Sequence, residues 1–155
     1  MLATQDHERW MKEAMREAEK AYAAAEVPVG AVVISNDRVI GRGHNRVEAL
    51  QDATAHAEML AITAASDTQG AWRLDDAFLY VTLEPCLMCA GAMQLARISR
   101  VVFGAPDKRF GACGSVYNVL QNPRANHHVD VVSGVLEERC AGILTSFFKE
   151  VRSNS

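Results

Sequence analysis

Amphipathic helical segments alternate with short apolar strands along this chain, and this alternation most constrains its fold. Residues 6–25 place apolar side chains at helical spacing on one face, namely Trp10, Met11, Ala14, Met15, Ala18, Ala21 and Tyr22. Strand patterns follow at residues 29–34 and 38–43, and Asn36-Asp37 between them is typical of a hairpin turn. The chain therefore opens with a helix followed by a β-hairpin.

The remaining segments continue the alternation. Thr54 is expected to cap a helix over residues 55–65. Pro85 suits the opening of a helix that runs to about residue 96, because its fixed φ fits a first helical turn. Further strands are expected at 77–82, 100–104 and 128–132, and a last helix at 136–151. The pattern predicts an α/β fold with helices on both faces of a mixed sheet.

Length and composition favour a single domain spanning residues 1–155. The chain is 49% apolar, which is enough for an ordinary core, and no apolar run reaches the roughly 18 residues of a membrane span. Residues 6–20 are acidic and amphipathic, unlike a signal or transit peptide. We therefore expect a cytoplasmic protein without a membrane partner.

Charge is unevenly distributed. The net charge is −3, but residues 1–96 carry 8 Lys/Arg and 14 Asp/Glu, whereas residues 97–155 carry 8 Lys/Arg and 5 Asp/Glu. The first part has a net charge of −6 and the second of +3. This asymmetry permits a local basic face for nucleic acid, and plain solubility explains it equally well.

The Cys-x-x-Cys pair is the first sign of chemistry. Cys86 and Cys89 share a helix face at their spacing of three. Together with His56 they supply two thiolates and one imidazole, a ligand set that suits zinc. Three protein ligands leave a fourth position for water, which is typical of a catalytic site. The sequence therefore predicts one zinc ion per chain.

Each part of this site has an ordinary alternative. A lone histidine at a helix start is often exposed or hydrogen-bonded, and a lone Cys-x-x-Cys is often a redox pair or half of a structural zinc knuckle. Neither alternative accounts for the histidine and the Cys-x-x-Cys pair together, and the chain has no second Cys-x-x-Cys. Cys113 and Cys140 stand apart and are interpreted as packing cysteines.

Glu58 follows His56 by two residues. A regular helix would point the two side chains apart, but a first turn is less constrained and the Glu side chain is long. His-x-Glu followed by Pro-Cys-x-x-Cys is the signature of zinc-dependent nucleobase deaminases, in which the Glu is the general acid and base. Glu58 is thus expected to move protons between a zinc-bound water and the substrate, although a Glu in a first turn also favours the helix dipole.

The sequence resembles the tRNA-specific adenosine deaminases along nearly its whole length. The Arg-Val-Val-Phe-Gly-Ala string at 100–105 and the Gly-Ser pair at 114–115 are more specific to this branch than the zinc strings. The other matching strings are 26–31, 43–46, 54–58, 79–86, 88–92, 111–112, 126–127 and 147–149.

This resemblance implies a three-layer α/β/α cytidine deaminase-like fold with a five-stranded sheet, and a homodimer. It implies conversion of adenosine to inosine at the wobble position of an arginine tRNA, with the anticodon stem-loop as partner. It also assigns roles in substrate binding. Val29 and Asn45 would line the base pocket, Ala57 and Glu84 would offer backbone contacts, and Asp107 and Asn126 would meet the nucleotides beside the flipped base.

The residues alone leave these substrate contacts open, since Asn45 and Asp107 are also good turn formers. The RNA phosphates would be met by Lys108, Arg109, Arg124 and Lys149. Two positions depart from the family pattern, because Arg109 stands where Lys is usual and His128 stands where Arg is usual. The second change reduces positive charge at neutral pH.

Two rival functions share some of these features. A deaminase of free bases or nucleosides would carry the same zinc strings, but residues 100–115 and the basic last third favour tRNA. A non-catalytic zinc-stabilised RNA-binding module would need no Glu58 and no open fourth position.

Overall fold

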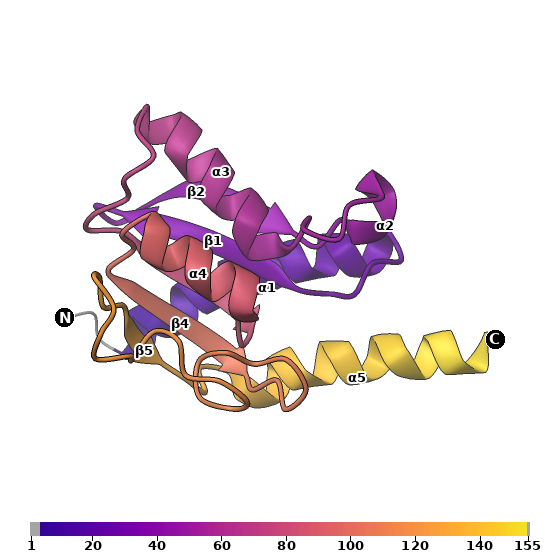
Figure 1. Cartoon of the computed structure of the whole chain (residues 1–155). Coiled ribbons are helices and arrows are strands. Elements are labelled where there is room, and N and C mark those ends of the chain that lie inside the picture. Colours follow the sequence, from indigo (N-terminus) through magenta and orange to yellow (C-terminus); the bar gives the residue numbers. More distant parts are fainter. Residues whose placement is uncertain (1–3, 155) are drawn as a thin grey trace.

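The computed structural model describes residues 4–154, which form a five-stranded sheet flanked by helices (Figure 1). The strands are β1 (Gly30–Ser35), β2 (Arg38–His44), β3 (Phe78–Leu83), β4 (Arg100–Ala105) and β5 (Asp130–Val132). The helices are α1 (Thr4–Ala23), α2 (Val47–Leu50), α3 (Ala57–Gln69), α4 (Leu87–Leu95) and α5 (Glu137–Ser153). None of the helices in residues 4–154 is long and apolar enough to cross a bilayer.

The sheet is mixed, with the strand order β2-β1-β3-β4-β5. β1 runs antiparallel to β2 and β3, whereas β3, β4 and β5 run parallel to one another. The hairpin between β1 and β2 turns at Asn36 and Asp37, whose φ angles of 51° and 60° suit a tight hairpin turn. The predicted turn and the predicted mixed sheet are both confirmed.

Helices cover both faces of the sheet, as the α/β/α prediction requires (Figure 1). α3 and α4 lie on one face and α1 and α5 on the other. Because side chains alternate along a strand, Val33 and Leu79 contribute to the core under α3 and α4, whereas Val32 and Tyr80 contribute to the core under α1. The central strands β1, β3 and β4 are thus buried on both faces, which explains their nearly continuous apolar sequences.

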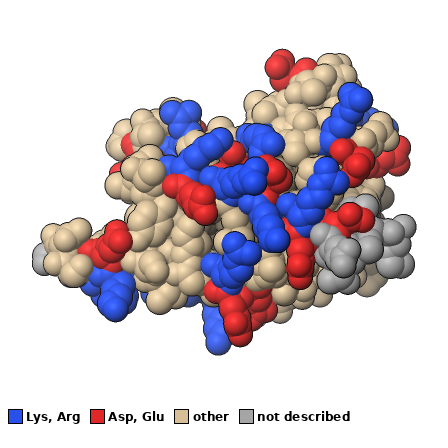
Figure 2. Space-filling model, turned by 180° about the vertical axis from the view of Figure 1, so that it is seen from behind, with Lys and Arg blue, Asp and Glu red and all other residues tan. Residues whose placement is uncertain are grey.

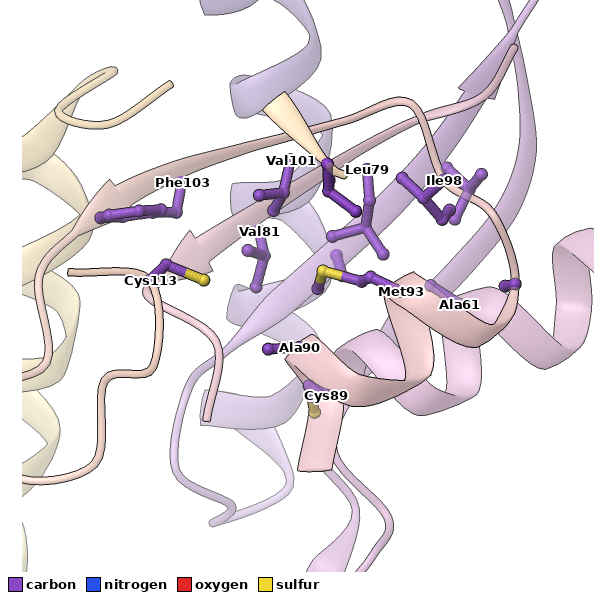
Figure 3. Packing of buried hydrophobic residues seen from close by; sticks show 14 of the residues in the cluster. Ala61, Leu79, Val81, Cys89, Ala90, Met93, Ile98, Val101, Phe103 and Cys113 are labelled. Carbon is purple, nitrogen blue, oxygen red and sulfur yellow. The ribbon is translucent and has the colours of Figure 1, made fainter. Parts of the chain in front are cut away.

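Helix α4 contains Cys89, follows Cys86 directly, and packs on the core between itself and the sheet. Figure 3 shows Met93 of α4 directed toward Leu79 and Val81 of the sheet. Cys113 belongs to this core and Cys140 to the core on the other face, and both are buried and free. Both fit their interpretation as packing cysteines.

Two expectations about helix starts were wrong. Thr54 does not cap α3, because its N–H and hydroxyl both donate to the Asp52 carboxylate at 2.8 and 2.7 Å, and the N-cap is His56. Pro85 precedes the helix it was expected to open, since Cys86 is the N-cap of α4. The short helix α2 was not predicted, because four residues carry no periodic signal.

The position of α3 depends on a glycine in β2. A Cβ added at Gly43 would lie 2.3 Å from the Ala57 carbonyl oxygen and 2.6 Å from the Ala61 amide nitrogen. Only a residue without a side chain allows the first turn of α3 to lie this close to the strand. Gly43 therefore sets where His56 and Glu58 stand relative to the sheet.

We expect Gly43→Ala to lower the free energy of unfolding by about 1–3 kcal/mol, the usual cost of overpacking. The contacts are backbone atoms of α3, so they cannot move aside cheaply. Gly142→Ala is the matched control, because a Cβ there meets nothing within 4 Å and it lies inside α5. The control should be neutral or more stable by about 0.5–1 kcal/mol. Equal urea midpoints for the two variants would contradict the role of Gly43.

Candidate active site

The predicted metal ligands meet where two helices begin. His56 is the N-cap of α3, Cys86 is the N-cap of α4, and Cys89 lies in the first turn of α4. Their ligand atoms all lie within 4.8 Å of one another. In the part of the chain that the structure describes, no other group of His, Cys, Asp and Glu shares this geometry.

The spacing of the donor atoms fits a single metal ion. Each cysteine Sγ lies 3.6 Å from His56 Nδ1. A sulfur at about 2.3 Å and a nitrogen at about 2.0 Å from one tetrahedral ion lie about 3.5 Å apart. Both sulfur–nitrogen distances therefore fit a metal bound through Nδ1 and the two sulfurs.

The electrostatics of the cluster favour a thiolate. A hydrogen bond from Cys89, together with His56, lowers the pKa of Cys86 to about 3. The pKa of Cys89 is raised instead, because it donates that hydrogen bond and is buried. The pKa of His56 is raised by its hydrogen bond to Cys86. The two helix N-termini add a positive potential that favours negative charge here.

Glu58 lies beside this cluster, although a regular helix would point its side chain away from that of His56. It is the second residue of α3 and only 4% exposed. Burial raises its pKa to about 7, against the attraction of His56. A carboxyl group with a pKa near neutrality is able both to accept and to return a proton.

A cavity of about 740 Å³ opens over the cluster. Glu58 lines it with His56 and Cys86. The predicted substrate-binding residues that also line it are Val29, Asn45, Ala57, Glu84 and Asp107. The volume is in the usual range for sites that bind small molecules or single nucleotides. The structure thus brings five of the six predicted substrate-binding residues to one pocket.

Asn126 is the exception. It lies in a separate hollow of about 670 Å³, whose other lining residues include Trp72, Leu95, Arg97 and His127. His127 Nε2 is 2.7 Å from the Ile98 carbonyl oxygen, and this contact anchors the segment away from the pocket. The structure does not bring Asn126 together with Glu58.

The predicted RNA-binding cations are all exposed. Lys108 and Arg109 lie between two pocket-lining residues, Asp107 and Phe110, and Lys149 follows the pocket-lining Phe148. Arg124 lies in the loop after Asn122, whose carbonyl oxygen is 2.9 Å from His128 Nε2. The face shown in Figure 2 instead mixes both signs of charge. In α1, Arg16 pairs with Glu13 at 3.0 Å.

Asn45 lines the pocket and also forms the hydrogen bonds of a turn. Its Nδ2 donates to the Val27 carbonyl oxygen at 3.1 Å, and its Oδ1 accepts from the Val47 N–H at 3.3 Å. These bonds fix the turn after β2 and also hold the side chain at the pocket wall.

Sequence reasoning missed the side chain of Glu26. It is 2% exposed, lines the pocket, and accepts hydrogen bonds from the N–H groups of Glu48 and Ala49 at 2.9 and 2.7 Å. Its partners lie in α2, which was itself not predicted. Glu26 therefore ties α2 to the pocket wall.

The side chain of Glu84 has a role distinct from its predicted backbone contact. It accepts from the N–H groups of Asp107, Cys113 and Ser115, each at 3.0 Å, and from the Ser115 hydroxyl. Burial alone would raise its pKa, but these hydrogen bonds hold the pKa below its ordinary value. The carboxylate thus fixes the loop that forms one wall of the pocket.

Comparison with known proteins identifies the family of this chain. A family model of MafB19-like deaminases matches residues 5–152. The tRNA-specific adenosine deaminase of Bacillus subtilis is 55% identical over 149 residues, which cover 96% of this chain and 92% of that protein. The chain belongs to the tRNA-specific adenosine deaminases.

Solved structures place this deaminase within a broader fold. A structure from work on A-to-I editing by tRNA:A34 deaminases has a TM-score of 0.84 and 45% identity, covering 87% of this chain and 98% of that chain. The guanine deaminase of Nitrosomonas europaea has a TM-score of 0.80 at 24% identity, covering 90% and 83%. The second likeness concerns the fold alone. Both confirm the predicted cytidine deaminase-like architecture, and family membership makes the protein an enzyme.

Proposed function

We propose that this deaminase converts adenosine to inosine by hydrolysis at the wobble position of a tRNA anticodon, with an arginine tRNA as its substrate. The observation that carries the proposal is the buried Glu58 beside the His56–Cys86–Cys89 cluster, in a chain of this family. We also propose a cytoplasmic location, where the tRNA substrate is found, and a single deaminase domain over residues 1–155.

We propose that His56, Cys86 and Cys89 hold one zinc ion per chain. The donor spacing and the soft sulfur ligands favour zinc over hard cations such as Mg²⁺ and Ca²⁺, which prefer oxygen ligands. When bound, zinc would lower the pKa of a water molecule at its fourth position toward neutrality. The remaining chemistry falls to the side chains of the pocket.

Glu58 is the proposed acid and base. Its carboxylate accepts a proton from the attacking water and returns it to the ring nitrogen next to the carbon that bears the amine. The water oxygen bonds to that carbon, and the same group then moves its remaining proton to the amine, so that the C–N bond breaks, ammonia leaves and the carbonyl of inosine forms. A pKa of about 7 suits each transfer. The neighbouring walls contribute by positioning the base and by excluding bulk water.

We propose that Val29 and Asn45 hold the faces and edge of the base, with the backbone of Ala57 and Glu84 beside them. Asp107 would meet a neighbouring nucleotide at the mouth of the pocket. Asn126 would contact RNA that extends beyond the pocket, since it lies in the separate hollow. An unpaired loop suits such a site, because its bases splay out at low cost.

The RNA backbone would be met by Lys108, Arg109, Arg124 and Lys149, which are all exposed. Neutralised phosphates release counterions, so binding through these groups weakens as salt rises. The net charge of +3 over residues 97–155 supports this assignment.

We also propose a homodimer. Leu87 and Leu95 of α4 are 47% and 77% exposed, and Trp72 is 66% exposed. Large exposed apolar side chains on one side of a protein often mark an association surface. The molecular mass in solution, against 16.9 kDa for one chain, tests this proposal.

Zinc content tests the metal site. We expect Cys86→Ala to lose most of the bound zinc, because two ligands remain where three are needed. Cys140→Ala is the matched control, since Cys140 is a buried cysteine in the other core. It should keep one zinc per chain by elemental analysis. Full zinc retention by Cys86→Ala would remove that residue from the site.

Substrate preference tests the proposed function against its rival, a deaminase of free bases. We expect inosine at the first anticodon position of an arginine tRNA stem-loop, with kcat/KM at least about 10²-fold above that for free adenosine. The reason is that remote contacts to the RNA lower the barrier at the reacting base. Inosine by sequencing and ammonia by coupled assay measure the two rates. Efficient turnover of free adenosine or guanine, with none of the stem-loop, would favour the rival.

A further inference from the structure

The loop at the mouth of the pocket is held from beneath by a buried carboxylate. Glu84 is 3% exposed and accepts hydrogen bonds from Asp107, Cys113 and Ser115. Gly111 permits this approach, because a Cβ there would lie 2.4 Å from the Glu84 carboxylate. The loop therefore has a defined position although much of its surface is exposed.

The side chain of Asp107 in turn fixes the backbone of the residues that follow it. Its Oδ1 accepts the N–H groups of Arg109 and Phe110 at 3.0 and 3.1 Å. The backbone of Phe110 is thus fixed through Asp107 to Glu84. The hydrogen bonds of Glu84 to Asp107, and of Asp107 to Arg109 and Phe110, hold the Phe110 backbone at the rim of the pocket.

The ring of Phe110 is left largely in solvent at that rim. Phe110 is 65% exposed and still lines the pocket that contains His56 and Glu58. An aromatic ring on an ordered backbone, turned to water, loses the free energy that burial would give it. This arrangement favours a partner that covers the ring when substrate binds.

The surroundings of Phe110 match a nucleic acid strand. Lys108 and Arg109 precede it in the same turn and are exposed. Cations beside an exposed aromatic ring at a pocket mouth form the usual combination for single-stranded nucleic acid, in which phosphates meet the cations and bases stack on rings. A free nucleoside has no second base to cover Phe110.

We propose that Phe110 is a stacking platform for the RNA base that flanks the deaminated adenosine, and that it thereby contributes to the preference for RNA over free nucleosides. The inference rests on the proposed function and adds a residue that determines specificity. Glu84 and Asp107 act through Phe110 as positioning residues for this contact.

The test combines protein and RNA changes. Phe110→Ala should raise KM for an anticodon stem-loop about tenfold, the scale of base–aromatic stacking, with kcat within about twofold of wild type. Phe110→Trp should restore KM, because it restores a stacking surface. Tyr117→Ala is the matched control, since Tyr117 is an exposed aromatic of the same loop segment that does not line the pocket. It should leave KM unchanged.

Stem-loops with an abasic residue on the 5′ or the 3′ side of the target adenosine complete the cycle. One of them should raise KM in wild type about as much as Phe110→Ala does, and should add nothing further in Phe110→Ala. Independent, additive effects for both abasic positions, or an unchanged KM in Phe110→Ala, would overturn the inference. If wild type forms no inosine in any stem-loop, the proposed function itself fails.

Discussion

Helix α3 lies so close to β2 that two strand positions have no room for a side chain. Added Cβ atoms at Gly41 and Gly43 would each lie 2.3 Å from a carbonyl oxygen of α3. The facing residues of the helix, Ala57, Ala61 and Ala65, are small and fully buried. This contact sets the height of the first turn of α3 over the sheet. His56 and Glu58 lie at that turn, where His56 Nδ1 is 3.6 Å from each cysteine Sγ.

Three buried glutamates surround the pocket, and their hydrogen bonds give them different tasks. Glu26 accepts two backbone N–H groups from α2, and Glu84 accepts three from the loop of residues 107–115. Both carboxylates therefore hold parts of the pocket wall in place. Glu58 is buried more deeply than its hydrogen bonds offset, and its pKa is raised to about 7. Environment, and not residue type, separates the proposed proton carrier from the two supports.

The sequence predicted most of the fold and the centre of the site because both rest on local patterns. Alternating helices and strands gave the layers, and the two short strings around His56 and Cys86 gave the cluster. Thr54 was misjudged, because its N–H and hydroxyl both donate to the Asp52 carboxylate and α3 begins only after His56. α2 was too short to show a period.

Other parts of the site depend on residues distant in sequence and so carried no local signal. The side-chain role of Glu26 requires partners 22 and 23 residues away. The exposure of Phe110 follows from a turn fixed by Glu84, 23 residues before Asp107. Asn126 was expected, through resemblance, to meet a nucleotide beside the flipped base, and the fold places it in a hollow separate from the pocket that contains Glu58.

The most direct test of the account is turnover by Glu58→Gln, which keeps the size of the side chain but removes the proton carrier. Inosine formation in an anticodon stem-loop and bound zinc would be measured on the same samples of wild type and variant. The account predicts that kcat falls by about 10²- to 10⁴-fold while the zinc content stays unchanged. Near-normal turnover by Glu58→Gln with zinc in place would contradict it.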